Sequence, residues 1–561
     1  MKVDVLVVGS GAAGLSAAVT AAMHGASVMV AEKASVLGGT SAWSGGWLWI
    51  PRNPLARAEG IDEAADAPLT YLQHEMGGEA ADIRLQTFLR YGPEMVEFFH
   101  QRTAVQFLSG SAMPDFHPSP GAANGGRSVT AQPYDGRLLG DWLHRLRPPL
   151  ETISLGGMGI AGGADMAHFF NATRSPRSAL YAARRLLRHG WQRLRAGRGQ
   201  HLVNGNALVA RLLRSALDAG VRFQLNAPVV RLLQGPPGVS GAVLRSDGGE
   251  IHVEAGAVVL ACGGFPHDRQ RLAQVVPHAA EGYGHFSAAP PDNQGEGIRL
   301  GESVGGQFDT SLRHPLAWAP VSRVTLASGQ QLMFPHLVER AKPGVIAVLP
   351  NGKRFVNEAD SYHDFIAALL AATPAGDTPQ AWLLADRRAL RRYGLGHARP
   401  FPFTPTAWLR TSYLQRGNTL AELAKQCAID ANALAETVER FNHFASAGED
   451  VDFHRGASAY NRAQGDHQVT LGPLREGPFY AVRILPGSLG TFSGLQTDEH
   501  ARVLDEQQQP IPGLYAIGND MSSVMRGYYP SGGITLGPAM TFGYLVGKNL
   551  AKKTNINNNI A

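Results

Sequence analysis

Short apolar runs separated by glycines mark the start of the chain. Residues 3–8 have the pattern of a short buried strand, and residues 15–19 carry small and apolar side chains at helical spacing. A second apolar run, residues 26–31, ends at Glu32. A strand, a helix and a second strand in this order predict an α/β protein with a parallel sheet.

The turn between the first predicted strand and the helix has the glycine spacing of a dinucleotide site. Gly9 makes the tight turn, Gly11 allows the backbone to approach a pyrophosphate, and Gly14 allows close packing of helix and strand. The phosphates are expected at the positive end of the helix, and Glu32 is placed to accept hydrogen bonds from the ribose. The predicted cofactor contacts in this segment are Gly9, Gly11, Ala12, Ala13, Gly14, Glu32 and Lys33.

A second cluster of small residues, at 38–46, indicates which dinucleotide binds. NAD-binding units rarely need a further group of backbone amides and hydroxyls, whereas the ribityl chain and three-ring head of FAD do. We therefore predict non-covalently bound FAD; the alternative is that this segment is only a flexible glycine loop. The predicted contacts here are Gly39, Thr40, Ser41, Ser44, Gly45 and Gly46.

Later segments extend the same site. The apolar run at 257–261 predicts a buried strand that ends in glycines and covers the adenine half of the cofactor. A second glycine-rich segment, 513–519, comes nearly five hundred residues after the first. If both glycine-rich segments hold one cofactor, the chain between them is an insertion into a single cofactor site. The predicted contacts are Val229, Ala261, Gly263, Gly518, Asn519, Gly533, Thr535 and Leu536.

The composition changes past residue 306, where proline, histidine and aromatic residues become more frequent. The predicted fold is α/β, a Rossmann-type FAD-binding domain of the glutathione-reductase kind with an inserted α+β substrate domain. We place the FAD-binding domain at 1–306 and 488–551, the inserted domain at 307–487, and a disordered tail at 552–561.

The overall composition excludes several classes of protein. The chain has 561 residues, enough for two domains, and its 66 glycines are well above the average of about 7%. The two cysteines, Cys262 and Cys427, exclude a disulfide framework and a cysteine-ligated metal cluster, so no metal is expected. We recognise no signal peptide and no bilayer-spanning stretch, and the expected compartment is the cytoplasm.

The net charge of +5 is unevenly distributed. No acidic residue lies between Asp165 and Asp218, and eight arginines fall at 174–198 among leucines, a tyrosine and a tryptophan at roughly helical spacing. A basic amphipathic helix is typical of a peripheral contact with an anionic membrane surface, here the inner face of the cell membrane. The alternative is a solvated helix face. Nucleic acid is not expected, because no binding motif is present.

The C-terminal segment carries candidate chemistry. Tyr529 and the backbone amide of Gly533 are placed to polarise a substrate carbonyl, as an oxyanion hole does. In the inserted region, residues 351–358 (Asn-Gly-Lys-Arg-Phe-Val-Asn-Glu) have the pattern of a turn and strand and are followed by Tyr362.

With the N-terminal fingerprint and the later Gly-Pro-Ala-Met-Thr-Phe-Gly run, these segments resemble the fumarate reductase/3-ketosteroid dehydrogenase group of flavoproteins. Tyrosines stand where the fumarate-type reductases use arginines, so the chain resembles the 3-ketosteroid Δ1-dehydrogenases in particular. The resemblance implies that Tyr362 is the base and that Tyr529 with Gly533 holds the C3 carbonyl. A third tyrosine of that family aligns with Phe116, and the missing hydroxyl puts the proton relay of the base, Tyr362, in doubt.

The expected reaction is 1,2-dehydrogenation of a 3-ketosteroid during steroid degradation, with electrons passed to a quinone-like acceptor. Alternatives are the steroid 4,5 position or another unsaturated or cyclic ketone. A further Gly-x-Gly-x-x-Gly, at 157–162, lacks a following βαβ unit and is expected to be a loop beside the cavity rather than a nicotinamide site. Phe116 and Trp49 are expected to line the substrate pocket, and His314 to be structural.

Overall fold

A parallel sheet is built around the first strand of the chain. In the computed structural model its parallel strands lie in the order β8 (Arg222–Gln224), β2 (Val28–Ala31), β1 (Lys2–Val8), β11 (Gly249–Leu260) and β20 (Pro510–Ala516). The predicted α/β class is thereby confirmed. Because β20 comes from the end of the chain, both ends contribute strands to one sheet.

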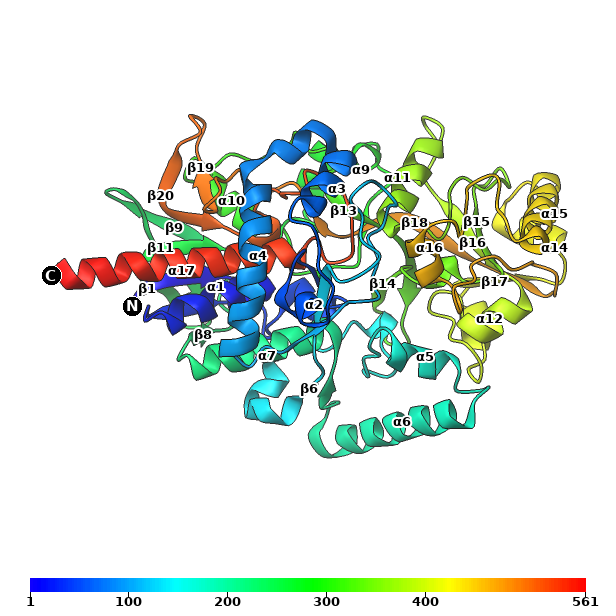
Figure 1. Cartoon of the computed structure of the whole chain (residues 1–561), viewed down its shortest axis with the longest axis horizontal. Helices are drawn as coiled ribbons and strands as arrows, with labels where there is room; N and C mark the ends of the chain where they lie inside the picture. The colour runs from blue at the N-terminus through cyan, green and yellow to red at the C-terminus, as the bar shows by residue number, and fades with distance from the viewer. Residues whose placement is uncertain (561) are drawn as a thin grey trace.

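Two further parts complete this lobe. The strands β9 (Val229–Gly235) and β10 (Gly238–Ser246) extend β11 as an antiparallel meander, and β19 (Arg502–Leu504) pairs with β20 at the edge. The structure describes the backbone of residues 1–560 and the side chains of residues 1–551. Figure 1 shows this lobe at the left and a second, sheet-containing lobe at the right.

Two helices from opposite ends of the chain pack along each other beside the parallel sheet (Figure 1). They are α1 (Ala12–Met23) and α17 (Leu536–Ile560). A Cβ atom on Gly543 would lie 2.6 Å from the carbonyl oxygen of Ala13, so only glycine allows this approach. The helical bounds of α17 reach Ile560. The predicted disordered tail, 552–561, lies beyond the residues whose side chains the structure describes, and it stays a prediction. Ala561 lies outside the described residues.

The second lobe contains a mostly antiparallel sheet centred on β18 (Phe479–Thr491). Its strand order is β14 (Gln331–Pro335), β13 (Leu316–Thr325), β18, β16 (Ala381–Ala385) and β15 (Val345–Val348). The short strands β12 (Phe286–Ser287) and β17 (Leu414–Gly417) also pair with β18. The predicted bounds 307–487 therefore leave out β12 and the end of β18.

Helices cover both lobes and the boundary between them. Those used below are α3 (Ala67–Met76), α5 (Ala164–Phe170), α6 (Pro176–Ala196), α11 (Tyr362–Ala372), α15 (Ala431–Ala447) and α16 (Ala459–Gln464). A small three-stranded sheet has the strand order β3 (Trp47–Trp49), β5 (Ser128–Ala131) and β4 (Phe107–Ser109). Within residues 1–560, no helix has both the length and the apolar character needed to cross a bilayer.

Candidate active site

One cavity of about 1290 Å³ reaches from the glycine turn after β1 to the helices of the second lobe. A typical single-ligand pocket has about 300–1,000 Å³, so this cavity has room for a dinucleotide and a substrate together. The lining residues come from the N-terminal turn, from 39–46, from the C-terminal segment and from the second lobe.

The three glycines of the first turn meet different constraints. Gly9 has φ +108°, and a Cβ there would lie 2.2 Å from the carbonyl oxygen of Ala261. A Cβ on Gly14 would lie 2.1 Å from the carbonyl oxygen of Gly9, so Gly14 is required by packing and does not line the cavity. Gly11 lines the cavity, and the nearest atom to its added Cβ is Ser41 Oγ at 3.5 Å.

The start of α1 offers donors to an anion. The Ala12 amide donates to Ser41 Oγ (3.0 Å), while the amides of Ala13 and Gly14 have no hydrogen-bond partner within the described part of the chain. Free amides at a helix N-terminus suit a pyrophosphate. Glu32 accepts hydrogen bonds from the Ser10 amide and hydroxyl and still lines the cavity. These groups fit an adenine dinucleotide.

Apart from Gly14, every predicted cofactor contact lines this cavity. These residues are Gly9, Gly11, Ala12, Ala13, Glu32, Lys33, Gly39, Thr40, Ser41, Ser44, Gly45, Gly46, Val229, Ala261, Gly263, Gly518, Asn519, Gly533, Thr535 and Leu536. Sequence reasoning missed Asn293, whose side-chain amide donates to Thr40 Oγ1 (2.9 Å) and to the Gly263 carbonyl (3.1 Å). The turn that contains Asn293 can be recognised in the sequence, but the contacts of Asn293 with Thr40 and Gly263 cannot, because these residues are distant along the chain.

Two tyrosines meet at the other end of the cavity. Tyr362 is the first residue of α11, and its hydroxyl donates to the Tyr529 hydroxyl at 2.8 Å. The two rings cross edge to face at 5.1 Å. Burial, followed by the neighbouring Tyr529, raises the pKa of Tyr362 well above its ordinary value, while Arg340 opposes this rise. Burial also raises the pKa of Tyr529, to about 12.

Gly533 follows Tyr529 by four residues and lines the same cavity as the tyrosine pair. It lines the cavity with φ +102°, and its amide has no hydrogen-bond partner among the described residues. Its carbonyl accepts a hydrogen bond from the Trp49 amide (3.1 Å). The prediction that Trp49 lines the pocket is wrong: its side chain is fully buried outside the cavity, because its indole N–H donates to the buried Asp115.

Phe116 lines the cavity as expected and packs against three tyrosines. Its ring stacks on Tyr529 (5.7 Å), meets Tyr362 edge to face (5.7 Å) and lies 4.4 Å from Tyr460. Tyr460, on α16, lines the cavity, and its hydroxyl has no hydrogen-bond partner in the described structure. No pattern in the sequence around Tyr460 predicts that it lines the cavity, because the tertiary fold places α16 there.

His117 fixes the loop that carries Phe116. Its ring nitrogens contact carboxylates of Glu75, on α3, and Asp364, on α11. Burial favours the neutral ring, but hydrogen bonds to Asp364 and Glu75 outweigh it and raise the pKa of His117 to about 10. Protonated His117 therefore ties the Phe116 loop to the helix that begins at Tyr362.

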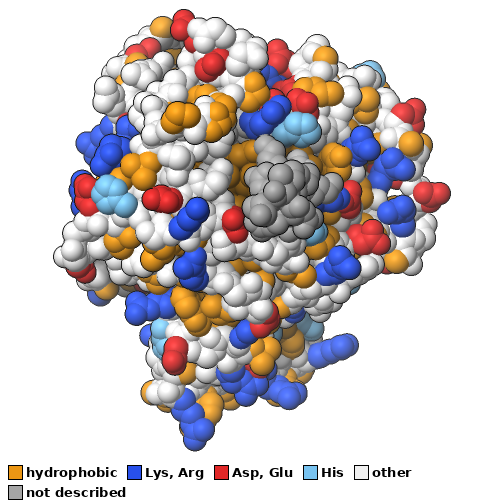
Figure 2. Space-filling model, turned by 90° about the vertical axis from the view of Figure 1, so that its left-hand side faces the viewer, with side chains coloured by type: hydrophobic (Ala, Val, Ile, Leu, Met, Phe, Trp, Pro, Cys, Tyr) orange, Lys and Arg blue, Asp and Glu red, His pale blue; other side chains and the backbone are white. Residues whose placement is uncertain are grey.

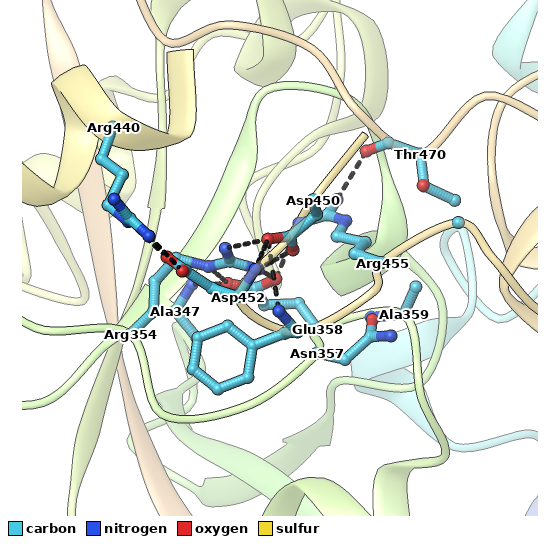
Figure 3. A network of polar contacts seen from close by, with 12 residues as sticks. Ala347, Arg354, Asn357, Glu358, Ala359, Arg440, Asp450, Asp452, Arg455 and Thr470 are labelled. Atoms are coloured by element: carbon cyan, nitrogen blue, oxygen red, sulfur yellow. Dashed lines mark hydrogen bonds and ion pairs between the residues drawn. The ribbon is translucent and has the colours of Figure 1, made fainter. Parts of the chain in front are cut away.

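A buried ion network holds the segment before α11 (Figure 3). Arg354 pairs with Glu358 (2.7 Å) and Asp450 (2.8 Å), and Arg455 also pairs with Glu358 (3.0 Å). Burial alone raises the pKa of Glu358, but the two arginines lower it to about 2. The expected strand at 351–358 is not formed, because the segment makes a turn and is held by these side chains instead of a sheet partner.

Two other sequence features lie where they were expected. His314 does not line the cavity; its Nδ1 is 2.8 Å from Nε2 of the buried His363, in agreement with a structural role. Residues 157–162 form no strand–helix–strand unit, and part of this loop borders the cavity.

Comparison with known proteins gives the family context for this geometry. A family model described as "FAD binding domain" matches residues 4–536. The chain is 39% identical over 558 residues to a 4-oxocyclohex-2-ene-1-carboxylate 5-dehydrogenase of Sinomonas cyclohexanicum, covering 98% of this chain and 94% of that one. It is 36% identical over 568 residues to a 3-oxosteroid 1-dehydrogenase of Mycolicibacterium smegmatis, covering 98% and 97%.

A solved structure matches equally broadly. The 3-ketosteroid Δ1-dehydrogenase of Sterolibacterium denitrificans, determined with 1,4-androstadiene-3,17-dione, superposes with a TM-score of 0.89 at 36% identity. The match covers 98% of this chain and all of that one. This chain therefore shares its fold with a flavoprotein of known structure over nearly its whole length.

Proposed function

The chain belongs to the FAD-binding-domain family of flavoproteins and is an FAD-dependent oxidoreductase acting on CH–CH groups, and from this premise we propose that it dehydrogenates 3-ketosteroids between C1 and C2. The observation that carries the proposal is the contact between the Tyr362 and Tyr529 hydroxyls, which lie 2.8 Å apart in the cavity that Gly533 also lines. Relatives that share 36% identity over nearly the whole chain act on this class of substrate.

The proposed mechanism divides the work between two polar groups and a base. Tyr529 and the free amide of Gly533 hold the C3 carbonyl and stabilise the enolate as its charge develops. Tyr362 takes the proton from C2. When bound, FAD supplies the hydride acceptor, at N5, for the hydrogen on C1.

The electrostatics of Tyr362 govern how well it acts as a base. A phenol with a raised pKa is a strong base once ionised, but its phenolate is scarce at neutral pH. Arg340 is buried, forms no ion pair among the described residues, and lowers the pKa of Tyr362. We infer that Arg340 increases the fraction of Tyr362 that is ionised.

In the proposed reaction, the two electrons taken from the substrate finally pass to a quinone-like acceptor.

A second candidate is a smaller cyclic ketone that carries a carboxylate. The cavity wall includes Arg399 and Lys342, neither of which forms an ion pair within the described chain. Burial lowers the pKa of Lys342, to about 8. Unpaired cations of this kind suit an anionic substrate, and one relative, 39% identical, is named for an oxocyclohexene carboxylate. The steroid 4,5 position is the remaining alternative.

Anaerobic mixing with androst-4-ene-3,17-dione tests the proposal. Bleaching of the flavin absorbance, with a 1,4-diene product identified by mass spectrometry and NMR, is the expected result. Bleaching by 4-oxocyclohexanecarboxylate but by no 3-ketosteroid would assign the second candidate. Androst-4-ene-3,17-dione already has a double bond between C4 and C5, so the other regiochemistry is tested with 5α-androstane-3,17-dione. A 4-ene product from that saturated steroid would assign 4,5-dehydrogenation.

A further inference from the structure

Helix α6 carries an apolar ridge on its outer side. Leu180, Leu187, Trp191 and Leu194 are 62%, 75%, 56% and 85% exposed. At 3.6 residues per turn these four side chains fall within an arc of about 60°, so they form one continuous line along a helix about 31 Å long. Of the fifteen large hydrophobic residues that are exposed in the described chain, five lie on this single helix.

Basic side chains follow one flank of the ridge. Arg177, Arg184, Arg188 and Arg195 occupy the next arc of about 40°, are exposed, and form no ion pair among the described residues. The guanidinium of Arg195 lies 4.3 Å from the ring centre of Trp191. The lower end of the molecule in Figure 2, where α6 lies in Figure 1, shows blue basic side chains beside orange apolar ones.

The other flank of the ridge leads into the cavity. Ala179, Ala182, Ala183 and Leu186 line the cavity wall, so the apolar surface of α6 continues from the outside of the molecule to the inside. Two more exposed hydrophobic residues, Phe401 and Phe403, line the same cavity. The mouth of the cavity is therefore bordered by exposed apolar groups.

We propose that α6 docks the protein on an anionic phospholipid bilayer, with the apolar ridge inserted, the arginines on lipid phosphates, and the cavity mouth facing the membrane. A ridge flanked by unpaired arginines is the pattern of an interfacial helix. A second copy of the chain fits less well, because the flanking positive charges would repel each other and four side chains are few for the ~800 Å² per partner of a stable interface.

Flotation with vesicles tests this docking on the full-length holoenzyme. Vesicles of phosphatidylcholine with phosphatidylglycerol are compared with pure phosphatidylcholine at low salt and near 1 M salt. We expect binding to the anionic vesicles that weakens with salt, because the Debye length falls from about 10 Å at 0.1 M to about 3 Å at 1 M. Wild-type protein that stays at the bottom at low salt would overturn the proposal.

Two variants separate the apolar and basic contributions. Replacing Arg177, Arg184, Arg188 and Arg195 by serine should weaken binding by about 100-fold or more. A matched control removes the same charge from four exposed arginines outside α6, namely Arg222, Arg245, Arg269 and Arg416, and should bind like wild type. The second variant replaces Leu187, Trp191 and Leu194 by serine and should also lose binding.

Folding and self-association are checked on the same proteins. Each variant must retain its flavin and its circular dichroism, since α6 also walls the cavity. If both α6 variants float as well as wild type, the helix is only a solvated face and the proposal fails. A wild-type dimer in analytical ultracentrifugation that the ridge variant abolishes, without vesicle binding, would instead assign the ridge to a second copy of the chain.

Discussion

Substituting Gly533 by alanine tests the proposed carbonyl site most directly. With φ +102°, the residue has a backbone conformation that costs a side-chain-bearing residue about 1–3 kcal/mol. The added Cβ would lie 2.6 Å from the Trp49 amide nitrogen, and ordinary contact begins at 3.4 Å, so the two backbones must separate by 3.4 − 2.6 = 0.8 Å. A displacement of this size takes the Gly533 amide out of hydrogen-bonding range of a carbonyl held by Tyr529.

The expected result is a fall in kcat/KM of about 10²–10³-fold, the effect of losing one oxyanion donor. Turnover is measured with a 3-ketosteroid and an artificial electron acceptor, alongside flavin content and Tm. Gly532→Ala is the matched control, because its φ is not in the left-handed region and the nearest atom to its added Cβ is the terminal methyl group of Met113 (2.8 Å), with the Phe116 ring at ordinary contact distance (3.7 Å). If Gly533→Ala retains near-normal kcat/KM with a full flavin complement, the amide does not act on the substrate.

Three further predictions follow from the same region. Tyr362→Phe should keep its FAD and lose about 10²–10⁴-fold in kcat. Because the pKa of Tyr362 is raised, its phenolate becomes more abundant as pH rises, and the wild-type rate should rise with it. A flat pH profile of the wild-type rate would contradict the role of Tyr362 as the base. Tyr460→Phe should lower kcat about 5- to 10-fold with little change in Tm, because its hydroxyl has no partner among the described residues to lose; a large drop in Tm would indicate a structural role instead. The pKa of His117 is raised to about 10, so its contribution is complete below its unfolded pKa of about 6.5 and is lost as pH rises through 10. Urea titrations at pH 7 and pH 10 should show wild type losing about 1–3 kcal/mol more than His117→Gln, and equal losses would refute the pairing.

Local signals in the sequence predicted the cofactor half of the molecule well. The turn of Gly9, Gly11 and Gly14 between a strand and a helix needs only neighbouring residues to be recognised, and the structure places it as expected. The tyrosine pair was reached through a resemblance, because Tyr362 and Tyr529 are separated by 167 residues and no local pattern joins them.

The substrate half depends on contacts between distant segments. Trp47 and Trp49 lie in the same three-residue strand, yet only Trp47 lines the cavity. The choice is made by Asp115, 66 residues away, which binds the Trp49 indole. In the same way, Tyr460 reaches the site only because α16 packs beside Phe116. Such partners are set by the tertiary fold and leave no periodicity in the sequence.

The pairing of the first strand has a consequence for how the protein is made. At about 5–20 residues per second, synthesis of the chain takes roughly 30–110 s. During that time β1 gains its neighbour β11 only after residue 260, and α1 lacks the packing of α17 until residues 536–560 have been made. The unit built on β1 therefore stays incomplete through most of this synthesis, and the cavity-lining residues Gly518, Asn519 and Gly533 join it only after the second lobe has been made.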